Sequence, residues 1–110
     1  MVVKSLYFER FPHVRNIYVV AFSEGQTYKS TIFTRSREQT LNFQVQFQNM
    51  TENSEIFMRI ANGRNRDILM THFKFENILK QANQNIVTVP ITFGDRSCKG
   101  RFELEFRIGH

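Results

Sequence analysis

The chain has 110 residues, and its 15 Lys and Arg against 10 Asp and Glu give a formal net charge of +5, which favours acidic partners. Hydrophobic residues make up 41% of the chain, which excludes an intrinsically disordered polypeptide, and the length fits one domain over residues 1–110. A single cysteine, Cys98, excludes a disulfide framework, and without a signal peptide or a run of roughly 20 apolar residues we expect a cytoplasmic protein.

Turn signals separate eight short stretches rich in apolar, β-branched and aromatic residues, each with the length of a β-strand. Gly25 marks the tip of the first hairpin, and Asn62-Gly63 is a strong turn signal after the fifth stretch. Apolar residues at helical spacing within 75–82 predict one short helix before the seventh strand. In chain order, we expect strands at 2–9, 17–22, 27–33, 41–48, 55–60, 68–75, 86–93 and 100–108.

Apolar and polar residues alternate almost without error in the fourth and eighth of these strands. Every second residue from Leu41 to Phe47 is apolar, and the same holds from Phe102 to Ile108. Because successive side chains of a strand project to opposite faces, each strand has one dry face and one wet face, which is typical of an antiparallel sandwich. The sequence therefore predicts an all-β fold, an eight-stranded antiparallel β-sandwich whose phenylalanines fill the space between the sheets.

Four short motifs follow one another along nearly the whole chain, at 16–19, 41–47, 67–70 and 100–104. In order and spacing they resemble the Asp-Pro-Tyr-Val, Asn-Pro-x-Trp-x-x-x-Phe-x-Phe, Asp-x-Ile-Gly and Gly-x-Leu-x-Leu motifs of the C2 domain family. Leu41 stands in the place of the tryptophan, and the glycine of the third motif is absent. The resemblance implies a C2-like sandwich, the fold best known for calcium-dependent lipid binding, as a piece of a larger protein.

The tip loops depart from the calcium-binding members of that family, in which about five aspartates surround the ions. The expected first tip loop, 11–16, has no carboxylate, and the third, 61–67, has only Asp67. Calcium takes roughly six to eight oxygen ligands, and carboxylates supply the charge. Arginines occupy both loops instead and repel a dication. We therefore expect a calcium-independent C2-like domain with no metal site.

No catalytic arrangement is visible in the sequence. His13, His72 and His110 are scattered along the chain, and Cys98 has no histidine near it. This spacing does not match a zinc site, and the chain contains no glycine-rich phosphate loop. We therefore expect a protein that is not an enzyme and carries no cofactor.

Basic residues provide the first binding hypothesis, which is contact with anionic phospholipid or phosphoinositide membranes or another acidic partner. Three of them lie in tip loops at one end of a C2-like sandwich, and three line the wet side and exit of the third strand. Each contributes about 1 kcal/mol near an anionic membrane, so three give roughly 3 kcal/mol, below the ~4 kcal/mol of millimolar binding. Solvated surface charge is the alternative interpretation. The residues are Arg15, Arg64, Arg66, Lys29, Arg35 and Arg37.

Nucleic acid is a competing acidic partner, and binding of single strands needs aromatic rings on a basic surface. The phenylalanines of the fourth and eighth strands are expected on the core face, opposite the charges. Tyr7 and Phe33 have the other parity and are the exceptions. A nucleic-acid role therefore ranks last.

A row of uncharged amides gives the third hypothesis, a protein-interaction face. Amides cost less to desolvate than charges, although a solvated strand is the alternative interpretation. The resemblance implies docking within scaffold, cytoskeletal or ciliary proteins, at the cytoskeleton or a membrane. We rank protein docking first, weak lipid binding second and nucleic acid third. The residues of this face are Asn42, Gln44, Gln46 and Gln48.

Overall fold

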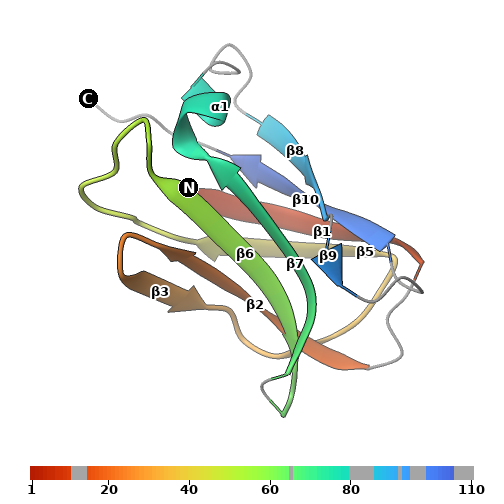
Figure 1. Ribbon diagram of the computed structural model, residues 1–110. Coiled ribbons are helices and arrows are strands. Elements are labelled where there is room, and N and C mark those ends of the chain that lie inside the picture. The colour runs from red at the N-terminus through yellow and green to blue at the C-terminus, as the bar shows by residue number, and fades with distance from the viewer. Residues whose placement is uncertain (11–14, 65, 80–85, 92, 95–98, 106–110) are drawn as a thin grey trace.

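Two antiparallel sheets pack face to face in the computed structural model, which describes residues 1–10, 15–64, 66–79, 86–91, 93–94 and 99–105 (Figure 1). The elements are β1 Val2–Arg10, β2 Asn16–Ser23, β3 Gln26–Lys29, β4 Phe33–Thr34, β5 Glu38–Gln44, β6 Glu55–Asn62, β7 Asp67–Lys74, α1 Phe75–Leu79, β8 Ile86–Pro90, β9 Phe93–Gly94 and β10 Lys99–Glu105. The first sheet has the strand order β5-β1-β10-β8. The second has the order β3-β2-β6-β7-β9, with β4 also beside β2. The all-β sandwich and the short helix before the seventh expected strand are therefore confirmed.

Several sequence-based predictions fall outside the described residues. They include most of the first tip loop with His13, the single cysteine Cys98, His110 and the last part of the eighth strand, 106–108.

The third expected strand, 27–33, is divided into β3 and β4. Ser30 explains the interruption, because its side chain takes part in the pairing with β2. Its Oγ accepts the N–H of Val19 at 2.9 Å, while its own N–H donates to the carbonyl of Val19 at 2.9 Å. The chain leaves the sheet at residues 31–32 and pairs again at Phe33, opposite Ile17.

The seventh expected strand, 86–93, is also divided, since it contributes to both sheets. β8 pairs with β10 in the first sheet as far as Pro90, which lacks the N–H that a ladder needs. β9 then pairs with β7 in the second sheet, opposite Leu69 and Met70. The chain thus crosses from one layer of the sandwich to the other within a few residues.

The fourth strand, expected at 41–48, is shifted toward the N-terminus and lies at Glu38–Gln44. Its alternation persists, with Leu41 and Phe43 half-buried. Asn42 has a φ of 48°, a backbone conformation that asparagine tolerates better than most residues. Beyond the strand, the fully buried Val45 exchanges two hydrogen bonds with Met1, at 2.8 and 2.9 Å. Burial lowers the pKa of the Met1 amino group below 8.0, against the opposing effect of the Glu105 charge.

The core lies between the inner faces of the sheets and contains most of the described phenylalanine rings. Phe8 and Phe102 are fully buried. Two phenylalanines do not follow this prediction, since Phe22 and Phe57 are 41% and 36% exposed on the outer face of the second sheet. The half-buried rings packed against the core are Phe33, Phe43, Phe47, Phe73 and Phe75.

A glycine allows the first and last strands to approach closely. A Cβ on Gly100 would lie 2.7 Å from the carbonyl oxygen of Tyr7 and 3.2 Å from the Phe8 ring. We predict that Gly100→Ala lowers the free energy of unfolding by about 1–3 kcal/mol, because β1 must move away from β10. Urea denaturation measures this change. The control is Gly63→Ala, whose Cβ meets no atom within 4 Å, and equal losses in both variants would contradict the prediction.

Candidate functional site

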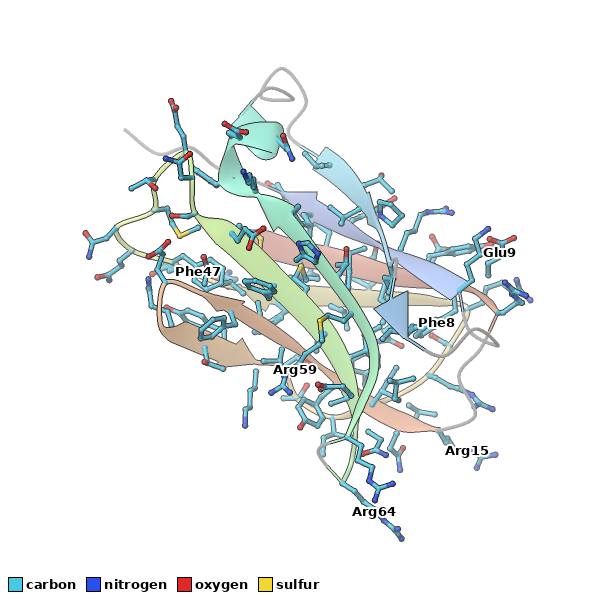
Figure 2. The ribbon with its side chains drawn as sticks, viewed as in Figure 1. Phe8, Glu9, Arg15, Phe47, Arg59 and Arg64 are labelled. Carbon is cyan, nitrogen blue, oxygen red and sulfur yellow. The ribbon has the colours of Figure 1, made fainter. Side chains whose placement is uncertain are left out.

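One end of the sandwich gathers arginines from three separate parts of the chain. Arg15 precedes β2, and Arg64 lies in the turn between β6 and β7; Figure 2 shows both at this end. β2 and β4 are paired here, and the N–H of Arg35 donates to the carbonyl of Arg15 at 2.8 Å. Arg15 and Arg64 are exposed, whereas Arg35 is half-buried.

The β6–β7 turn is closed by Asn62. Its Oδ1 accepts the N–H groups of both Arg64 and Arg66, each at 2.9 Å. Asparagine side chains commonly form such bonds two residues ahead in turns. The sequence indicated this turn from Asn62-Gly63, and the structure shows that the asparagine also positions the two arginines.

The structure groups the expected basic residues differently from the sequence. The N–H of Phe8 donates to the carbonyl of Arg37 at 2.8 Å, so Arg37 lies at the end of β1, near the loop that leads to Arg15. Lys29 is exposed in β3, opposite Val20, and lies on the outer face of the second sheet. We call the following residues the basic end: Arg15, Arg35, Arg37, Arg64 and Arg66.

Two further basic residues were missed by the sequence interpretation. Arg10 at the end of β1 is opposite Lys99 at the start of β10, and the Lys99 ammonium lies 3.3 Å from the Glu9 carboxylate. Pairing of the first and last strands places them next to the basic end. Only knowledge of that pairing would have identified them.

The carboxylate of the third tip loop is already paired. Asp67 Oδ1 accepts a hydrogen bond from Arg59 Nη1 at 2.8 Å (the position of Arg59 is shown in Figure 2). Among the described residues, no group of three or more His, Cys, Asp or Glu side chains could hold a metal ion. No helix in the described part of the chain is long and apolar enough to cross a membrane.

The row of amides does not lie on one strand. Asn42 and Gln44 are exposed in β5, whereas Gln46 and Gln48 follow it. Gln26 exchanges two hydrogen bonds with the main chain of Gln48, both at 2.8 Å. The Tyr28 hydroxyl also donates to the carbonyl of Gln46 at 2.7 Å. These bonds join the edges of the two sheets, so the backbone of this segment has a structural role.

The outer face of the second sheet carries three stacked rings on neighbouring strands. Phe22 of β2 is opposite Phe57 of β6, with ring centroids 6.3 Å apart, and Phe57 is opposite His72 of β7, at 5.7 Å. The imidazole Nδ1 of His72 lies 3.7 Å from the Glu55 carboxylate. The sequence interpretation took His72 for a structural strand residue and did not find this row.

A hollow of about 240 Å³ adjoins the three rings. Val20, 1% exposed, is among the residues that line it and belongs with Tyr18 and Ala61 to a small apolar cluster separate from the main core. We call the exposed rings and the hollow together the outer strip. The residues that line the hollow are Val20, Phe22, Thr27, Phe57, Arg59, Asp67 and Met70.

The fold is that of C2 domains, as solved structures show. The chain is similar to a fragment of Extended-Synaptotagmin 2 that consists of its two C2 domains, with a TM-score of 0.70 and 8% identity over 93% of this chain and 36% of that one. It is also similar to a longer fragment of Extended-Synaptotagmin 2, which holds the SMP domain and both C2 domains, with a TM-score of 0.69 and 8% identity over 93% of this chain and 25% of that one. No family model and no curated protein matches the sequence. The chain thus spans about a quarter to a third of the length of these two solved fragments.

The turn at Asn62 gives a test of how the arginines are held. We predict that Asn62→Ala lowers the free energy of unfolding by about 1–2 kcal/mol, since two N–H groups lose their acceptor. Hydrogen exchange at the Arg64 and Arg66 amides should become faster. Asn62→Asp keeps an acceptor oxygen and serves as the control. Unchanged exchange in Asn62→Ala would contradict this account of the turn.

Proposed function

We propose that this domain is a non-catalytic, calcium-independent docking module that binds a partner protein through the outer strip. The observation that carries the proposal is the exposure of Phe22, Phe57 and Met70, at 41%, 36% and 37%, on adjacent central strands. Apolar groups next to one another on a surface favour an interaction site over random scatter. Aromatic side chains and methionine are also enriched where proteins bind each other.

The chemistry of the outer strip supports binding more than catalysis. Its charged side chains are engaged in ion pairs, Arg59 with Asp67 and His72 with Glu55. The other side chains that line the hollow are apolar, apart from Thr27. A hydrolytic or transfer enzyme needs a nucleophile with a base beside it, and the described part of this surface does not offer that pair.

The basic end supports calcium independence. Calcium needs several carboxylates around one point, whereas this end presents guanidinium groups. The Asp67 carboxylate, which comes from its third loop, is bonded to Arg59. A cation brought here would lose hydration and meet like charge.

Binding to anionic lipid through the basic end is the second candidate, favoured by the grouping of its five arginines at one end. At about 1 kcal/mol each they would supply roughly 5 kcal/mol, above the ~4 kcal/mol of millimolar binding. That affinity is modest, so a membrane role would need a second module. Nucleic acid remains third: Arg101 covers the Tyr7 ring at 4.1 Å, and Phe33 packs against the core. A cytoplasmic location at a scaffold, cytoskeletal structure or membrane fits the first two candidates.

Photo-crosslinking tests the protein-docking proposal. A photoreactive phenylalanine analogue at position 57 should form a covalent adduct with one recurrent protein in an extract of the source cells. The same analogue at Thr88, which is exposed on β8 of the other sheet, is the control and should not form that adduct.

Vesicle sedimentation separates the two candidates. We expect little pelleting with phosphoinositide vesicles at physiological salt, with or without calcium, because electrostatic attraction is screened there. Strong pelleting that Arg64→Glu with Arg66→Glu abolishes, together with no adduct from position 57, would contradict protein docking and establish the lipid candidate. Pelleting that appears only with calcium would contradict calcium independence.

A further inference from the structure

We propose that the hollow of the outer strip binds one large apolar side chain from an acidic linear segment of the partner protein. This inference rests on the proposed function and adds the chemistry of the partner. Three features support it: the size of the hollow, the fixed geometry of its walls and the charges around it.

The size of the hollow fits a single side chain. Its volume of about 240 Å³ is below the roughly 300–1,000 Å³ of sites for drug-sized ligands. Val20 is nearly inaccessible, while Phe22, Phe57 and Met70 remain exposed around it. Protein interfaces concentrate their binding energy in pockets of this kind, where one side chain of the partner is fully desolvated.

The walls of the hollow are held in place before any partner binds. β2 and β6 are internal strands of the sheet, each paired on both sides. Arg59 is fixed by its 2.8 Å bond to Asp67, and Phe57 is stacked between Phe22 and His72. A preformed site avoids the entropic cost of ordering its side chains on binding.

The charges around the outer strip favour an acidic partner. Two carboxylates of this face are engaged by cations of the same face, Asp67 by Arg59 and Glu55 by His72. Lys29 on β3 and Lys74 on β7 are exposed on that face and form no ion pair within the described residues. An acidic segment would pair with these two lysines, which gives electrostatic complementarity.

The positions of the lysines give the spacing of the acidic residues. Lys29 is opposite Val20, and Lys74 is opposite Glu55, so the lysines lie three strand spacings apart across the sheet and four residues apart along it. With spacings of about 4.8 Å and 3.3 Å, the diagonal is roughly 20 Å, or about six residues of an extended peptide. The segment should therefore carry acidic residues about six positions apart, with the apolar residue between them.

Selection from a random dodecapeptide library on the wild-type domain tests this inference. Selected peptides should contain Leu, Met, Phe or Trp between Asp or Glu residues. Binding of a fluorescently labelled selected peptide is then measured by polarisation. Phe57→Ser, and separately Lys29→Glu with Lys74→Glu, should each weaken the affinity by about tenfold or more.

Two matched controls separate the site from general effects. Arg64→Glu with Arg66→Glu makes the same change in net charge at the basic end, and Ile32→Ser removes another exposed apolar side chain, 60% exposed between β3 and β4. Both should change the affinity by less than about twofold, and circular dichroism should show that all four variants are folded.

Several results would overturn the inference. Selected peptides without acidic residues, or a loss of affinity only in the arginine variant, would contradict it. Sedimentation that shows a wild-type dimer and a Phe57→Ser monomer would assign the outer strip to a second copy of the chain instead. An adduct from position 57 without any selected peptide would refute the linear acidic segment and leave protein docking intact. Failure of both experiments would refute both.

Discussion

The sandwich buries only one face of each strand, and β2 is apolar on both faces. Its inner residues Val19 and Ala21 belong to the main core, while Val20 and Phe22 project from the other side. A two-layer fold has no second partner for that side within the described residues. The outer apolar surface is therefore a consequence of packing β2 at all, and β6 extends it with Phe57. The proposed docking function depends on this feature.

Charge and apolar surface occupy different parts of the molecule. The basic end is built from turns and strand ends, where main-chain bonds such as those of Asn62 and Arg35 fix the backbone and leave arginine side chains at the surface. The outer strip is built from strand interiors, in which cross-strand pairing sets the spacing of Phe22, Phe57 and His72. Rigid strand positions suit specific recognition of a side chain. Exposed surface charge suits long-range attraction, which falls with salt.

Alternation predicted the fold well where one face of a strand is dry. Leu41 and Phe43 are half-buried and Phe102 is fully buried, as expected from a period of two. The same reasoning cannot assign a face when the pattern is continuous, as in Ile17 to Phe22, and so the exposure of Phe22 was missed. The division of 27–33 was also missed, because a serine side chain that replaces a ladder partner has no distinct sequence signature.

The candidate site was only partly visible in the sequence. The turn chemistry of Asn62-Gly63 located Arg64 and Arg66, since local bonds determine that structure. Arg37 joined the basic end through a long-range bond to Phe8, which depends on strand pairing that no local pattern gives. The row formed by Phe22, Phe57 and His72 likewise requires the register of three strands.

The accessibility of the aromatic rings to a dissolved paramagnetic probe, measured by NMR, tests the central claim most directly. The account predicts that the Phe22 and Phe57 resonances broaden strongly in the free domain, while those of Phe8 and Phe102 do not. It also predicts that the captured partner protein protects the first two rings. Protection of Phe22 and Phe57 in the free domain, or broadening that persists with the partner bound, would contradict it.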